Sequence, residues 1–175
     1  MNCISMTMRA ATMTFAVLAG TAGLQAQNPL STELKGAYNA IKTNVTKAAE
    51  RMPEDQYGFK AAPDIRTFGG LIGHIADAQL FYCSPLTGTA KRGDAERTKT
   101  AKADIQAALK ASFEVCDSVI NSLTDADAMA MIAGRGGQRS KLSTLWGMVA
   151  HSNEEYGYLS VYMRLKGIVP PSTQP

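Results

Sequence analysis

The stretch SKLSTLWGMVAHSNEEYGYLSVYMRLKGIVPP, from Ser140 to Pro171, decides the fold of this chain. It marks both ends of one long helix, because the hydroxyl of Ser140 can cap the N-terminus and Gly167 can take the left-handed conformation that ends a helix. The prolines that follow forbid any continuation. The residues between cap and glycine predict a rod about 40 Å long. Residues at three- and four-residue steps predict one broad buried face: Leu145, Met148, Val149, Ser152, Tyr156, Leu159 and Met163.

His151 and Glu155 lie at the edge of that face, four residues apart and therefore on the same side of the helix. Imidazole is the commonest metal-ligating side chain, and a carboxylate can complete a three-ligand set. The third ligand must come from another helix, and His74 is the only other histidine in the chain. From spacing alone, a packed core histidine and a solvated glutamate are the more common explanation of such a pair.

Three more amphipathic helices are predicted from apolar residues that recur at helical spacing without strand-like alternation. With the long helix, they run over 31–52, 67–84, 99–123 and 141–166. The second has three glycines in its first two turns, at a cost of about 1 kcal/mol each against alanine. Close approach of another backbone or of a ligand would explain these glycines, and mere tolerance of glycine is the alternative. Four such helices predict an all-α protein with the architecture of a four-helix bundle.

The segments between these helices are rich in proline, glycine and charge and are predicted to be loops. They cover residues 53–66, 85–98 and 122–138, and the last can hold a short helical turn around 127–132. No strand is predicted in any of them. Basic residues concentrate just after the second loop begins, where Asp94 and Glu96 interrupt them, which is typical of a solvated loop.

Residues 1–26 have the pattern of a secretory signal peptide. Arg9 is their only charged residue, an apolar run covers 10–20, and small residues precede a predicted cleavage after Ala26. An ordinary N-terminal helix is the less favoured alternative, because the stretch lacks a polar face. The apolar run is too short to span a bilayer by itself. The prediction is therefore a secreted or periplasmic domain over residues 27–175 without a stable membrane anchor.

Charge narrows the class of partner. The chain carries 18 basic and 15 acidic residues, a formal net charge of +3, and loss of the predicted signal would remove one arginine and leave +2. So small and dispersed an excess does not favour nucleic acid or an anionic membrane as a partner. A small-molecule substrate is the expected partner, and exposed helix faces leave room for a homodimer.

Cys83 and Cys116 are the cysteines that remain after the predicted signal peptide. An even pair in an exported protein favours a disulfide over two buried thiols. A thiol nucleophile is the least favoured role, since no basic residue lies near either cysteine in sequence. A disulfide would close a loop of about 30 residues and stabilise the fold by about 3 kcal/mol on the chain-entropy account.

The stretches FGGLIGHIADAQLFYCS and HSNEEYGYLSVYMRLKGIVPPS resemble the DinB/YfiT-like superfamily, four-helix bundles many of which hold a divalent metal ion with three histidines. The resemblance covers nearly the whole chain after the predicted signal. It matches His74 to the histidine of the family's second helix and His151 to the first histidine of its last helix. Four further residues fit the ending of that last helix: Gly157, Tyr162, Arg164 and Gly167.

Position 155 departs from the family pattern, because Glu155 stands where the family has its second histidine. Two histidines and one carboxylate can bind zinc, nickel, iron or manganese. The resemblance therefore implies a site for one divalent ion at His74, His151 and Glu155. The change weakens affinity for soft metals, and a lost site is the alternative. Three tyrosines are candidate hydrogen-bond donors around the site or to substrate, although such aromatic residues more often belong to the core: Tyr82, Tyr156 and Tyr162.

Two functions stay open at this level. The resemblance links the chain to thiol S-transferases, maleylpyruvate isomerase-type enzymes and metal-dependent hydrolases, and so implies a metal-dependent hydrolase or transferase that acts on a small molecule. Export argues against thiol transfer, because low-molecular-weight thiols are mainly cytosolic. The alternative is an exported, non-catalytic binding or structural bundle with a degenerate metal site. The sequence does not decide between an enzyme and such a bundle, and it assigns no catalytic residue.

Overall fold

The structure is a computed structural model that describes residues 28–134 and 136–173. The predicted signal peptide lies outside these residues. The helices are α1 (Pro29–Arg51), α2 (Phe68–Cys83), α3 (Ala95–Thr98), α4 (Lys102–Ile120), α5 (Asp125–Met129) and α6 (Lys141–Leu165). The strands are β1 (Met131–Gly134) and β2 (Gly137–Ser140), and short 3-10 turns cover Glu54–Gln56, Ser84–Thr87 and Pro171–Thr173. None of the helices in the described part of the chain is both long and apolar enough to cross a bilayer.

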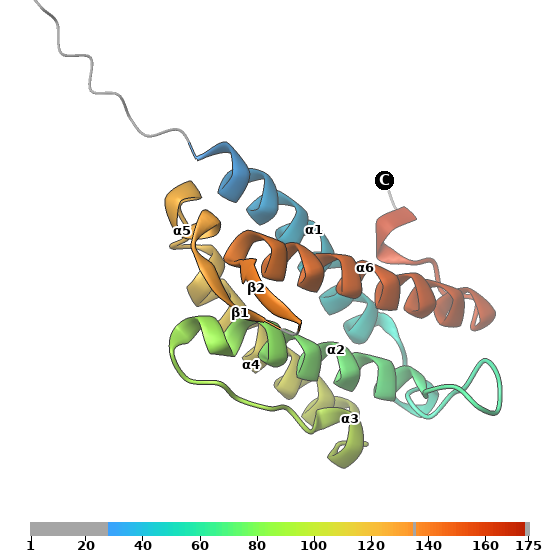
Figure 1. Cartoon of the computed structure of the whole chain (residues 1–175). Coiled ribbons are helices and arrows are strands. Elements are labelled where there is room, and N and C mark those ends of the chain that lie inside the picture. Colours follow the sequence, from blue (N-terminus) through green and yellow to red (C-terminus); the bar gives the residue numbers. More distant parts are fainter. Residues whose placement is uncertain (1–27, 135, 174–175) are drawn as a thin grey trace, which may run out of the picture.

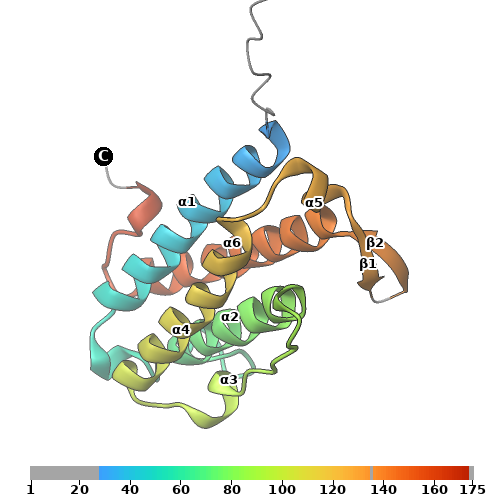
Figure 2. The ribbon, with the colours of Figure 1, turned by 90° about the vertical axis from the view of Figure 1, so that its left-hand side faces the viewer.

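Four long helices, α1, α2, α4 and α6, form one bundle (Figure 1), as the sequence predicts. The α2 helix packs against α4 and α6, and α1 packs against α6 and α4. Their apolar faces meet in a common core, in which Leu34, Phe68 and Leu145 are fully buried. Figure 2 shows the short α3 helix beside α2, with α5 and the strands near the N-terminal end of α6.

The predicted ends of α6 are confirmed, whereas α4 is shorter than the predicted 99–123 and α1 begins two residues before the predicted 31. The Ser140 hydroxyl accepts a hydrogen bond from the Ser143 amide at 3.1 Å, and Gly167 has a φ of 73°. The Thr67 hydroxyl likewise accepts from the Gly70 amide at 2.9 Å, which fixes the start of α2. These caps satisfy amide groups that have no partner inside the helix.

The prediction that the chain has no strand is wrong. The antiparallel strands β1 and β2 form a hairpin whose register pairs Met131 with Ser140 and Gly134 with Gly137. Its turn uses glycine where φ is positive, at 87° for Gly136 and 134° for Gly137. The helical turn predicted around 127–132 occurs slightly earlier, as α5.

The prediction of a continuous loop over 85–98 is also wrong, because α3 forms near its end. The cap of α3 comes from another helix. The Asp77 carboxylate of α2 accepts hydrogen bonds from the amides of Ala95 at 2.8 Å and Glu96 at 3.1 Å. A four-residue helix held by a tertiary cap leaves no periodic signal in its own sequence.

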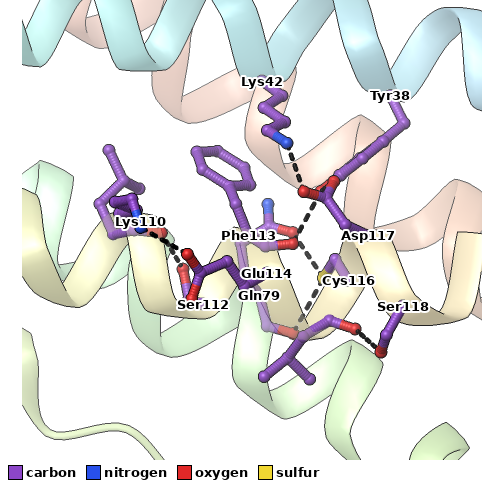
Figure 3. Close-up of polar contacts among 12 residues, drawn as sticks. Tyr38, Lys42, Gln79, Lys110, Ser112, Phe113, Glu114, Cys116, Asp117 and Ser118 are labelled. Carbon is purple, nitrogen blue, oxygen red and sulfur yellow. Dashed lines mark hydrogen bonds and ion pairs between the residues drawn. The ribbon is translucent and has the colours of Figure 1, made fainter.

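A polar clamp joins α1 to α4 (Figure 3). The Tyr38 hydroxyl donates to Oδ1 of Asp117 at 2.9 Å, and the Lys42 ammonium pairs with the other carboxylate oxygen. Burial and then the Asp117 charge raise the pKa of Tyr38 far above its usual value. The phenol therefore stays protonated and keeps donating to the carboxylate.

A disulfide bond joins α2 to α4. The Sγ atoms of Cys83 and Cys116 lie 2.00 Å apart, with their Cα atoms 5.1 Å apart. These are the two cysteines that the sequence favours as a disulfide pair. The bond lies in the core, where both residues are fully buried.

Candidate metal centre

His74, His151 and Glu155 converge between α2 and α6. Nε2 of His74 and Nδ1 of His151 each lie 3.7 Å from Oε1 of Glu155. The imidazole rings meet edge to face, with their centroids 5.0 Å apart and their planes at 61°. One ligand atom from each residue lies within 4.8 Å of the others, so this group could hold a single metal ion. The two helices thus bring together the three side chains that the sequence singles out.

The burial of the Glu155 carboxylate is easier to explain if the carboxylate binds a cation. Its side chain is only 7% exposed, whereas the two imidazoles are about one quarter exposed. Its Oε2 atom is buried and has no hydrogen-bond partner among the described residues. A buried carboxylate oxygen without a partner is costly, and a metal ion bound by the two imidazoles would remove that cost.

Glu96 fixes the orientation of His74. Nδ1 of His74 lies 2.8 Å from Oε2 of Glu96. A carboxylate only accepts hydrogen bonds, so Nδ1 carries the proton and donates it. The other ring nitrogen then presents its lone pair toward Glu155. A carboxylate behind a metal-ligating histidine is the usual arrangement around protein metal sites.

The Glu96 carboxylate is itself held in its charged form. Nε of Arg66 donates to Oε1 of Glu96 at 2.7 Å. Burial by itself raises the pKa of the Glu96 carboxyl, but hydrogen bonds from Arg66 and His74 outweigh burial and keep that pKa below its usual value. The carboxylate is therefore present to accept the His74 proton at neutral pH.

A glycine on α2 lets Glu96 reach His74. A Cβ atom on Gly73 would lie 2.8 Å from the backbone nitrogen and Cα of Glu96, too close for any other residue. One turn further along α2, the Asp77 carboxylate holds the first amides of α3. The close backbone approach that the glycines of this helix predict is thus confirmed at Gly73, and it serves to seat α3.

The three candidate tyrosines lie in different places. The ring of Tyr82 is 6.4 Å from that of His151, beside the centre. The Tyr162 hydroxyl donates to the carbonyl oxygen of Arg66 at 2.7 Å, and so supports the residue that holds Glu96. Tyr156 is not brought to the centre. Its hydroxyl lies 3.0 Å from the Ser172 hydroxyl and accepts from the Ser172 amide, because its position on α6 points toward the C-terminal segment.

A hollow of about 340 Å³ opens beside the centre. Both imidazoles border it, and its other walls come from α2 and from the loop before α3. A small molecule in this hollow would reach any ion held between the two histidines. The arrangement can therefore bind a cation on one side and a ligand on the other.

Glu96 is the residue of the centre that sequence reasoning missed. Its segment has no helical periodicity, and its charge reads only as an interruption of a basic cluster. The useful signal lay in α2, where Gly73 indicates a close neighbour and precedes His74 directly. That signal predicts an approach of some backbone, without saying which one.

Comparison with protein families matches residues 37–159 to the DinB superfamily. A search of curated proteins gave no significant match. Among solved structures, the chain is similar to a DinB-like protein from Bacillus cereus, with 19% identity, a TM-score of 0.68, and coverage of 82% of this chain and 97% of that one.

Two further structures have a TM-score of 0.63 and cover 77% of this chain. One is a DinB-like protein from Bacillus subtilis, at 19% identity and 92% coverage of its own chain. The other is a conserved protein from Enterococcus faecalis, at 13% identity and 95% coverage. At such identities the structures support the fold alone.

Proposed function

This chain belongs to the DinB superfamily, and from that premise we propose that His74, His151 and Glu155 hold one divalent metal ion at which a small molecule binds. The observation that carries the proposal is the convergence of two imidazoles on a buried carboxylate that has an unpaired oxygen. Two nitrogen ligands and one oxygen ligand suit zinc, nickel, iron or manganese. Three protein ligands also leave positions open for water or substrate.

Each residue of the centre has a separate task in this proposal. The imidazoles of His74 and His151 supply neutral nitrogen ligands, and Glu155 offsets part of the charge of the ion. Glu96 keeps the proton of His74 on Nδ1 and so keeps Nε2 available. When bound, the ion supplies Lewis acidity, which lowers the pKa of a bound water or thiol and polarises a bound carbonyl.

The activity we propose is a metal-dependent hydrolase or transferase on a small molecule. The hollow beside the imidazoles supports it, because ligand sites are concave and few. We place the protein outside the cytoplasm, on the strength of the signal-like residues 1–26 and of the Cys83–Cys116 bond. The alternative function, a non-catalytic exported bundle, requires that the centre binds no ion.

Metal analysis of protein purified without chelators tests the proposal. We expect close to one divalent ion per wild-type chain and loss of most of it in His151→Ala and Glu155→Ala. Glu154→Ala is the matched control, because this neighbouring carboxylate is exposed and, among the described residues, forms a hydrogen bond only with the Tyr158 hydroxyl, at 3.4 Å. A wild type that is metal-free after incubation with these ions, and melts as His151→Ala does, would favour the non-catalytic bundle.

A further inference from the structure

We infer that the hollow beside the metal centre binds a small carboxylate with an apolar, aromatic body, and that Arg92 selects its negative charge. This inference rests on the proposed function, because it names the class of molecule that would meet the ion. The hollow, at about 340 Å³, is at the small end of ligand sites and accommodates one compact molecule. His74 and His151 border it, so that molecule reaches the ion directly.

The apolar body is indicated by the wall that α2 presents. Phe81 lines the hollow and is 58% exposed, although it is a large aromatic residue. Tyr82 lies next to it with an edge-to-face ring contact at 5.2 Å, and Ala78 adds a methyl group one turn earlier. An aromatic ligand would cover this surface and make the same kind of ring contact with it.

The negative charge is indicated by what remains unpaired in the hollow. Besides the two histidines, its ionisable charged residues are Asp77 and Arg92. Both oxygens of Asp77 already accept amides at the start of α3. Arg92 forms neither a hydrogen bond nor an ion pair with any residue that the structure describes. Arg92 is therefore the charged side chain of the hollow that has hydrogen-bond donors to offer a ligand, and a bound divalent ion would add positive charge.

Arg92 sits on a loop that is fastened on both sides. Before it, the Lys91 amide donates to the buried Ser84 hydroxyl at 2.6 Å, and that hydroxyl lies 3.1 Å from the Lys91 carbonyl oxygen. After it, Gly93 lies so close to Asp77 that a Cβ atom there would overlap the carboxylate. The loop therefore holds the base of the Arg92 side chain at the rim of the hollow.

The geometry favours a carboxylate over a phosphate. A guanidinium forms two parallel hydrogen bonds with a carboxylate or with a phosphate, so the rest of the hollow decides between them. Phosphate sites usually add several backbone amides or a helix N-terminus, and the first amides of α3 are not available for this because they donate to Asp77. One arginine in the same hollow as one bound metal ion suits a single small organic anion.

Binding of benzoate and of its neutral counterpart benzamide to zinc-loaded protein tests the inference. Calorimetry or ligand-observed NMR should show benzoate binding about tenfold or more tightly than benzamide, because a charge-assisted pair is worth more than a neutral one. Arg92→Ala should abolish that preference by weakening benzoate alone, and Arg92→Lys should keep part of it. Arg97→Ala is the matched control, because Arg97 lies nearby with an exposed ion pair to Asp94.

The outcomes separate this inference from the proposed function. Equal binding of benzoate and benzamide by the wild type, or unchanged benzoate binding by Arg92→Ala that still holds its zinc, would overturn the inference and leave the metal site standing. A protein that takes up no zinc yet loses benzoate binding on Arg92→Ala would overturn the metal site and support the anion subsite. Zinc content should be the same in Arg92→Ala and the wild type, because Arg92 makes no contact with the ligands.

Discussion

The two nitrogens of His74 have different partners, and this asymmetry organises the centre. Nδ1 lies 2.8 Å from Glu96, whereas Nε2 lies 3.7 Å from Glu155. The shorter contact fixes the proton on Nδ1, and the longer one leaves room for an ion between nitrogen and oxygen. A zinc–nitrogen bond is about 2.0–2.1 Å, so the present separation suits two bonds that meet at one ion.

Replacing Glu96 by glutamine should weaken the centre without removing a ligand. The amide is neutral and polarises the His74 ring less, so we expect divalent-metal affinity to fall by about 10- to 100-fold. Competition with a chromophoric chelator measures the dissociation constant. Asp94→Asn, a charge loss just before α3, should leave it unchanged, because within the described part of the chain the Asp94 carboxylate pairs with the exposed Arg97 alone. Equal affinities in Glu96→Gln and the wild type would show that Glu96 has no part in binding.

At the level of single residues, the sequence predicts the three candidate metal ligands but not Glu96, the residue that orients one of them. His151 and Glu155 share one helix, so their spacing alone places them together, and His74 follows as the one other histidine and from the family resemblance. Glu96 reaches the centre only through the packing of α3 on α2, which is a tertiary contact. Local periodicity carries no information about such a contact.

Among the elements, α3 depends most on its neighbours. It has four residues and no side-chain cap of its own, and its position follows from Gly73 and Asp77 of α2. An isolated helix of this length is unstable in water. The contact with α2 is therefore what forms it, and what brings Glu96 to the centre.

Gly73→Ala should disturb α3 and the centre together. The added methyl group would meet the Glu96 backbone at 2.8 Å, so we expect a loss of about 1–3 kcal/mol in the free energy of unfolding. Metal affinity should fall with it, because Glu96 is displaced. Gly157→Ala is the control in α6, since its methyl group meets nothing within 4 Å.

The control should gain up to about 1 kcal/mol from better helix propensity. Urea denaturation of the three proteins measures these free energies. If Gly73→Ala were as stable as the wild type and bound metal equally well, the close approach of α3 would not be needed for the centre.

The long helices were predictable because each carries an apolar stripe at helical spacing, and α2 and α6 also begin at a capping hydroxyl. The hairpin β1–β2 was not, because its four-residue strands have no buried residue and show no clear alternation of apolar and polar residues. Glycine residues 136 and 137 were visible in the sequence, but they fit a loop as well as a hairpin turn. Only the pairing of backbone groups distinguishes the two.

For the molecule as a whole, the Cys83–Cys116 bond ties α2 to α4. Its position at the end of α2 is about 13 Å along the helix from His74, at 1.5 Å per residue. The bond therefore contributes to the stability of the bundle and not to the geometry of the centre. The sequence favoured this pairing from cysteine number and predicted export, without knowledge of the distance.

Replacing both cysteines by serine should lower the free energy of unfolding by about 3 kcal/mol, because the unfolded chain loses a constraint over 33 residues. Thermal or urea denaturation measures the loss, and wild type kept in dithiothreitol should match the variant. Metal content should stay that of the wild type. Detection of two titratable thiols in the denatured, unreduced protein with the predicted signal removed would contradict the pairing.

The α2 helix takes part in two cross-links of different kinds: a covalent one to α4, and, with an ion in place, a coordinate one to α6. A chelator would remove only the cross-link between α2 and α6, and a reductant only the cross-link between α2 and α4. Amide hydrogen exchange along α2 should thus respond to each reagent on a different side of the bundle. In a metal-poor medium the protein would lose stability between α2 and α6, and in a reducing medium between α2 and α4. The α2 helix takes part in both changes.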